Sequence, residues 1–219
     1  MGESYKYGYG IKQNKRTAAH WLEKAAIAGN ASAQALLAMC YFDGEGVKKD
    51  TKKGFKYARL SAEKNCLKGL SALAGAYLYE KGTKKNVKKA LELFEKAASL
   101  GDAFSQAYLG YMYWHGHNVK KDYKKAFKLF KSAAERGDTK AQMYLGICYH
   151  NGNGTRKNYK KAVYWLKLAA QESDSEAQYF LALAYQDGEG VVKNKRMANY
   201  WLKKAASAGN EQAIAHLAK

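Results

Sequence analysis

The chain has 219 residues, of which 47% are hydrophobic and 13% aromatic, a composition typical of a folded core rather than of a disordered segment. It has no run of about 18 apolar residues, which excludes a transmembrane helix, and its N-terminus lacks the residue pattern of a signal peptide. The formal net charge of +19 points to an anionic partner or surface.

A ten-residue motif recurs six times at a spacing of 36 residues, for example YFDGEGVKKD at 41–50 and YQDGEGVVKN at 185–194. Its paired glycines and lysines look like a phosphate-binding loop, but such a loop needs a preceding strand and occurs once per domain. Six copies in register instead predict one solenoid domain of stacked repeats. The expected units are a partial repeat at 1–30, full repeats at 31–66, 67–102, 103–138, 139–174 and 175–210, and a partial repeat at 211–219.

Each full repeat predicts two helices, as residues 103–138 illustrate. Ser105, Leu109 and Tyr113 recur every four residues and so share one face of a first helix, which we expect to end near Gly116. A second helix is expected to begin after an Asp or Asn that is present in every copy, because these residues cap helix N-termini. The six capping residues are Asn14, Asp50, Asn86, Asp122, Asn158 and Asn194.

This pattern resembles the Sel1-like repeat family, a relative of the tetratricopeptide repeat. The resemblance rests on Leu109-Gly110, Tyr113, HGHNVKKD at 115–122, Ala126, Leu129 and SAAERGD at 132–138, with counterparts in every copy. It implies an all-α fold, a right-handed superhelical solenoid of about six helix pairs. It also implies a non-catalytic scaffold for protein–protein interaction, of the kind used in bacterial signalling, host contact or toxin neutralisation.

Two loops depart from the pattern. Glu80 replaces the first loop glycine of one copy, and Asn118 replaces the second loop glycine of the next. Asn tolerates the left-handed backbone conformation that the glycines supply, whereas Glu does not. We therefore expect the loop at Glu80 to be reshaped.

Basic residues recur around the start of each second helix. Positive charge there opposes the helix dipole, so helix stability does not explain it. One interpretation is an edge that attracts an acidic partner, and the other is a solvated, lysine-rich loop. Only five of the 38 basic residues are arginine, which disfavours sequence-specific nucleic-acid recognition. The basic ridge is defined as Lys48, Lys52, Lys84, Lys88, Lys120, Lys124, Arg156 and Lys160.

Aromatic residues on the first helices form the second candidate surface. In solenoids of helix pairs the first helices line the inner surface, and exposed aromatic rings there are suited to binding a peptide or protein. The alternative is that these rings pack between neighbouring first helices. Binding of an anionic surface, either lipid headgroups or nucleic acid, through the basic ridge is the alternative function. The expected groove residues are Phe42, Tyr79, Phe104, Tyr111, Trp114, His115 and His150.

No residue pattern indicates catalysis, a metal site or a cofactor. Cys40, Cys66 and Cys148 are odd in number and widely spaced, so neither a disulfide framework nor a zinc site is expected. Unpaired thiols favour a cytoplasmic location, with a periplasmic or secreted one as the alternative if a signal peptide precedes this chain. Both ends fall midway through a first helix, so we expect either a piece of a longer repeat protein or self-association through open ends.

Overall fold

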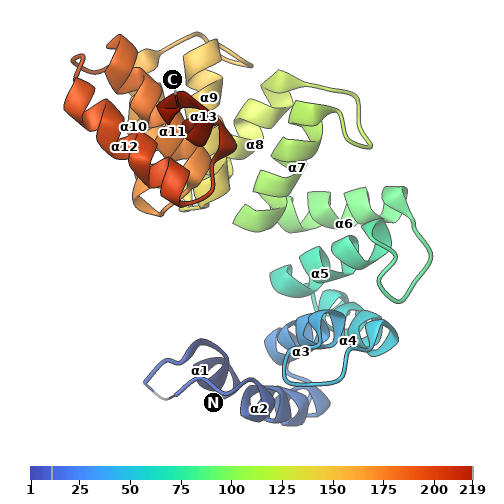
Figure 1. Ribbon diagram of the computed structural model, residues 1–219. Helices are drawn as coiled ribbons and strands as arrows, with labels where there is room; N and C mark the ends of the chain where they lie inside the picture. The colour runs from blue at the N-terminus through green and yellow to red at the C-terminus, as the bar shows by residue number, and fades with distance from the viewer. Residues whose placement is uncertain (11, 219) are drawn as a thin grey trace. The chain divides into compact units, whose positions relative to one another are not determined.

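The computed structural model describes residues 1–10 and 12–218, and every segment of regular secondary structure in this part is an α-helix (Figure 1). The all-α prediction is therefore confirmed. The helices are α1 Gly2–Tyr7, α2 Lys15–Ile27, α3 Ala31–Asp43, α4 Thr51–Glu63, α5 Leu67–Leu78, α6 Val87–Ser99, α7 Ala103–His115, α8 Tyr123–Glu135, α9 Thr139–Asn151, α10 Tyr159–Gln171, α11 Ser175–Asp187, α12 Lys195–Ser207 and α13 Glu211–Leu217.

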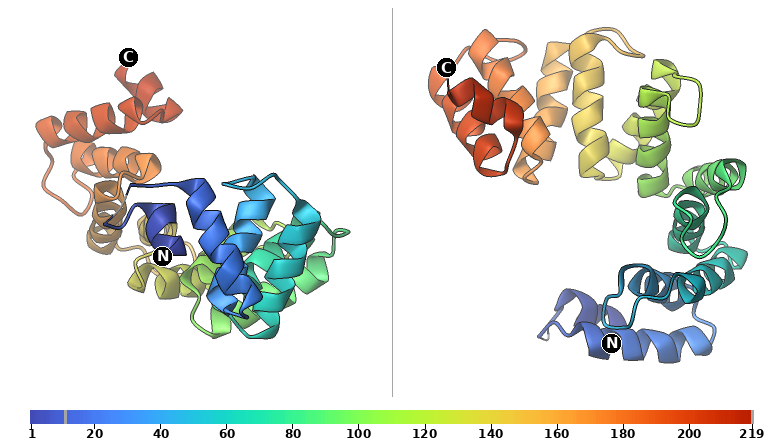
Figure 2. Two further views of the ribbon diagram at one scale, coloured as in Figure 1. Left: turned by 90° about the horizontal axis from the view of Figure 1, so that it is seen from below. Right: turned by 45° about the vertical axis from the view of Figure 1, so that its right-hand side comes forward.

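The chain divides into two compact units. Met1–Ser105 holds α1 to α6 and the first turn of α7, and Gln106–Lys219 holds the rest of α7 and α8 to α13. In the first unit each helix from α1 to α6 packs against the next, and in the second unit each helix from α8 to α13 does the same. Figures 1 and 2 show these successive helices lying against one another within each unit. Each unit is thus built by stacking helix pairs.

The six predicted capping residues begin the second helices α2, α4, α6, α8, α10 and α12. In each, a side-chain oxygen accepts a hydrogen bond of 2.9–3.0 Å from the backbone N–H three residues later. We call the first residue of each ten-residue motif the motif tyrosine. The capping residue's own N–H donates to the carbonyl of this tyrosine, as Asp50 does to Tyr41 at 2.9 Å. In every copy this backbone bond joins the end of the first helix to the start of the second helix, so it holds the two ends of the loop together.

In four of the loops the second glycine has no room for a side chain. A Cβ built on Gly46, Gly82, Gly154 or Gly190 would lie 2.0–2.3 Å from a backbone carbonyl oxygen at the start of the preceding second helix. All four glycines also have a positive φ, between 73° and 77°. The glycines therefore let one repeat's loop lie directly on the helix start of the repeat before it.

The expectation that Glu80 reshapes its loop is wrong. Glu80 itself adopts the left-handed conformation, with φ 55°, as Asn118 does with φ 60°. The loop keeps two bonds of its counterparts, since Lys81 N–H donates to Ala76 O and Asn86 N–H donates to Tyr77 O. The difference is at the helix end, where α5 stops one residue earlier in register than α3. These backbone bonds hold Glu80 in a conformation that its side chain disfavours.

Replacing this residue with glycine tests that account. We expect Glu80→Gly to raise the free energy of unfolding by about 0.5–1 kcal/mol, because the left-handed strain is released and only part of the gain is lost to the more flexible unfolded chain. Urea unfolding followed by circular dichroism measures the change. Glu80→Ala retains the strain and serves as the control. A glycine variant no more stable than the alanine variant would contradict the account.

Candidate protein-binding surfaces

Three aromatic residues of the C-terminal part of α7 and its loop meet at the surface of the second unit. The rings of Tyr111 and His115, one turn apart on α7, lie 4.4 Å from centroid to centroid. His117, in the loop, stacks on His115 at 5.3 Å and meets Tyr111 edge-on at 5.5 Å. Both histidines are exposed and Tyr111 is half-buried. These rings form a continuous surface patch rather than scattered exposed side chains.

Tyr144 on α9 supports this patch from beneath. Its ring stacks on the fully buried Phe130 of α8 at 4.8 Å and meets Tyr111 edge-on at 6.1 Å, and its hydroxyl lies 3.4 Å from His115 Nε2. Trp114 lies against Tyr144 at 5.7 Å. We call Tyr111, Trp114, His115, His117 and Tyr144 the aromatic cluster. Helices α7, α8 and α9 hold these rings in one arrangement.

The two polar groups where the cluster meets its support are held neutral near pH 7. Burial, followed by the negative charge of Glu176, raises the pKa of the Tyr144 hydroxyl. Partial burial lowers the pKa of His115, and the charges of His117 and Lys121 lower it further. Tyr144 and His115 therefore offer neutral rings with hydrogen-bonding edges, a combination suited to protein contacts.

Of the seven aromatic residues expected in the groove, the structure brings three together: Tyr111, Trp114 and His115. Sequence reasoning missed Tyr144 as their support. A signal was available, since Tyr108, Tyr144 and Phe180 occupy the same slot in three successive repeats. Trp114 is more deeply packed than Tyr111, with its ring 5.0 Å from Tyr123 and 6.1 Å from Phe130.

The other four expected groove residues lie elsewhere. The expectation of an exposed ring is wrong for Phe42, which is 5% exposed and packs over Gly54, where an added Cβ would lie 2.5 Å from the ring. Tyr79 and Phe104 are exposed residues of the first unit. His150, in the second unit, bonds Glu189 at 2.7 Å, so it ties α9 to the loop after α11.

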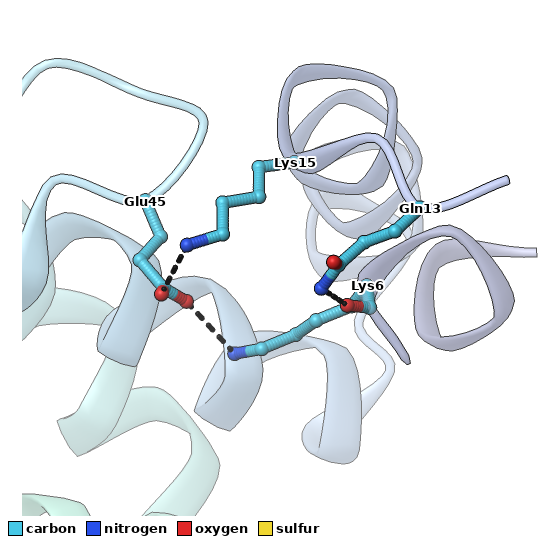
Figure 3. A network of polar contacts seen from close by, with 4 residues as sticks. All are labelled: Lys6, Gln13, Lys15 and Glu45. Atoms are coloured by element: carbon cyan, nitrogen blue, oxygen red, sulfur yellow. Dashed lines mark hydrogen bonds and ion pairs between the residues drawn. The ribbon is translucent and has the colours of Figure 1, made fainter. Parts of the chain in front are cut away.

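All eight residues of the basic ridge are exposed, four in each unit. Within residues 1–10 and 12–218, none of the eight forms an ion pair with a carboxylate. Lys15, outside the ridge, behaves differently: Glu45 bonds its Nζ at 2.9 Å and pairs with Lys6 at 3.8 Å, beside a bond from Gln13 to the Lys6 carbonyl (Figure 3). The carboxylates of the described residues thus do not neutralise the ridge charges.

A different lysine in the first turn of α4, α6, α8 and α10 has a structural role. It directly follows the ridge residue of that helix. The Nζ atoms of Lys53, Lys89, Lys125 and Lys161 lie 5.1–5.5 Å from the ring centroids of Tyr41, Tyr77, Tyr113 and Tyr149. A cation over an aromatic face at an exposed site contributes about 0.5–1 kcal/mol. The helix dipole disfavours positive charge at a helix start. The four motif tyrosines therefore stabilise lysine charges that the dipole would otherwise disfavour.

The described residues contain neither a group placed to bind a metal ion nor, at Cys40 and Cys148, a readily ionised thiol. Among residues 1–10 and 12–218, no three His, Cys, Asp or Glu side chains are placed to share a metal ion. Burial raises the pKa of the Cys148 thiol to about 12 and also raises that of Cys40, so neither is a ready nucleophile. In this same part of the chain no helix is long and apolar enough to cross a membrane.

Comparison with known proteins decides the family. The family model described as Sel1 repeat matches six segments, at 1–30, 31–66, 68–102, 103–138, 139–174 and 175–210. The chain belongs to the Sel1 repeat family. Sel1 repeat proteins generally act as non-catalytic scaffolds for protein–protein interaction. No curated protein matches the chain.

Solved Sel1 repeat structures resemble it over nearly its whole length. A Sel1 repeat protein from Oxalobacter formigenes is 32% identical with a TM-score of 0.84, covering 98% of this chain and 87% of its own. A protective antigen of uropathogenic Escherichia coli is 31% identical with a TM-score of 0.80 and covers 97% of this chain, which spans only 45% of that antigen. An immunity protein from Pseudomonas aeruginosa, 16% identical with a TM-score of 0.63 over 96% of this chain and 83% of its own, shares the fold alone.

Proposed function

We propose that this protein is a non-catalytic scaffold that binds a peptide or protein partner at the aromatic cluster. The observation that carries the proposal is the surface patch of Tyr111, His115 and His117, with Tyr144 and Phe130 stacked beneath it. Rings held in place before binding lose little conformational entropy when a partner arrives. Tyr and His also join apolar area to a hydrogen-bonding edge, which suits a protein surface.

The basic ridge contributes by steering an acidic partner. Its charges are exposed and form no ion pair with a carboxylate of the described residues, so they add to a long-range positive field. Such a field mainly speeds encounter and has less effect on dissociation. The partner is therefore expected to carry a net negative charge near the surface that it presents.

A capture experiment tests the proposal. The purified chain is used as bait in lysate of the source organism at about 0.15 M and about 0.5 M salt, beside the Tyr111→Ala/His115→Ala variant. We expect a protein that remains at high salt and is lost with the variant. A protein retained equally by the variant would reject the aromatic cluster as its site.

Charge reversal on the ridge separates steering from contact. We expect Lys120→Glu/Lys124→Glu/Lys160→Glu to slow association of the captured partner by about tenfold or more at low salt, with the dissociation rate changed far less. Surface plasmon resonance at two salt concentrations measures both rates. An unchanged association rate would contradict the steering role.

The second candidate function is binding of an anionic surface through the ridge alone. It is favoured by the ridge residues, none of which pairs with a carboxylate in the part of the chain that the structure describes. If the ridge neutralises six phosphates of duplex DNA, the slope of log K against log salt would be roughly −5. Vesicles with and without anionic lipid provide the parallel test. Binding that vanishes at high salt and ignores the Tyr111→Ala/His115→Ala change would support this function over the first.

A further inference from the structure

A hollow of about 590 Å³ is lined by the end of α10 and by α12 in the second unit. None of the seven residues that line it is acidic. Arg196 and Lys204 supply two positive charges, and Met197, Tyr200 and Trp201 supply apolar surface, beside Ala170 and Gln171. These residues are separate from the aromatic cluster and from the eight-residue ridge.

The hollow combines aromatic faces with positive charge. Lys204 Nζ lies 5.3 Å from the Tyr200 ring centroid and 5.8 Å from that of Trp201, so the ammonium sits beside both rings. Tyr200 is 46% exposed, so part of its ring is available for contact from solvent. The indole Nε1 of Trp201 is buried without a hydrogen-bond partner among the described residues. A carboxylate that reached it would make a bond that this part of the chain does not provide.

The last repeat departs from the others at one of the positions that line the hollow. At the slot of Met197, four other repeats carry the lysine that lies over a motif tyrosine. Methionine removes that charge and leaves a flexible apolar side chain, a residue type common at binding surfaces. Met197 is therefore particular to this repeat, whereas Tyr200 and Trp201 have counterparts in Tyr164 and Trp165 one repeat earlier.

We infer that the hollow is a second docking site, and that its occupant is an acidic peptide segment of a partner protein in which a carboxylate neighbours an aliphatic side chain. The carboxylate lies between Arg196 and Lys204, and the aliphatic side chain covers Met197, Tyr200 and Trp201. Charge complementarity selects this occupant, since two cations without a lining carboxylate attract an anion. The site does not depend on the aromatic cluster.

The test uses one defined probe and two readouts. The probe is the acetylated, amidated peptide of sequence ELDELD, and its uncharged counterpart is QLNQLN. Two-dimensional ¹H–¹⁵N NMR of the full chain follows the indole N–H signals of the four tryptophans, with that of Trp201 assigned from Trp201→Phe. We expect ELDELD to shift the Trp201 signal with a Kd below about 1 mM, and QLNQLN to bind at least tenfold more weakly.

Two exposed-residue variants with matched controls complete the design. Lys204→Glu and Tyr200→Ala are each expected to weaken ELDELD at least tenfold, whereas Lys203→Glu, its neighbour on α12, and Tyr164→Ala, the same slot one repeat earlier, weaken it less than threefold. No Trp201 shift, or equal weakening by Lys203→Glu and Lys204→Glu, overturns the inference. A shift of Trp114 alone would place the peptide on the aromatic cluster and also overturn it, while leaving the proposed function intact.

Discussion

Gly154→Ala is expected to lower the free energy of unfolding by about 2–4 kcal/mol. The added Cβ would lie 2.1 Å from the carbonyl oxygen of Tyr123, at the start of α8, and backbone cannot move aside as a flexible side chain can. The left-handed φ of 74° adds about 1–2 kcal/mol of strain, and overpacking typically adds about 1–3 kcal/mol. Urea unfolding followed by circular dichroism measures the loss.

Gly152 in the same loop is the matched control. Its φ is 80°, but its nearest neighbour would be 3.5 Å from an added Cβ, an ordinary contact. Gly152→Ala should therefore introduce backbone strain without a steric clash. Because alanine also makes the unfolded chain less flexible, we expect the free energy of unfolding to fall by only about 1 kcal/mol. Equal losses at the two positions would mean that the close approach of successive repeats does not depend on the second glycine.

The largest expected effect on binding belongs to Tyr111→Ala combined with His115→Ala. Together these changes remove two of the three rings of the surface patch. Hot-spot residues at protein interfaces cost about 2 kcal/mol or more each when truncated. We expect the affinity for a captured partner to fall at least a hundredfold, measured by isothermal titration. Trp114→Ala is unsuited to this test, because its ring also packs on Phe130 and Tyr123.

Tyr164→Ala controls for the loss of an exposed ring on another helix of the same unit. Tyr164 is 58% exposed on α10 and stands outside the cluster. Its removal should change affinity less than threefold, and the circular dichroism of both variants should match that of the parent chain. A similar loss in the two variants would indicate a general effect on the unit rather than a binding site.

Much of the fold could be predicted because the register repeats without a slip. Six capping residues at one spacing each predicted a helix start, and each begins a second helix. The loop at Glu80 could not be predicted from propensity. The conformation of this loop depends on backbone hydrogen bonds within the repeat, and these outweigh the preference of the Glu80 side chain.

The candidate site was predicted less well, because one residue along a helix turns a side chain by about 100°. Phe42 and Trp114 share a slot that points toward the second helix, whereas Tyr79 and His115 share the next slot, which is exposed. Sequence reasoning placed both slots on one inner face. Tyr144 was missed because its importance comes from stacking on Phe130, a contact between helices that spacing along one helix cannot reveal.

Site-specific photo-crosslinking at Tyr111 tests most directly whether the aromatic cluster binds a protein. A benzophenone amino acid replaces Tyr111 in one sample and Tyr164 in the other, and each is irradiated in lysate of the source organism. We predict one protein crosslinked at position 111 and not at 164, and displaced by excess parent chain but not by excess Tyr111→Ala/His115→Ala. Equal crosslinking at both positions, or equal displacement by the variant, would contradict the account.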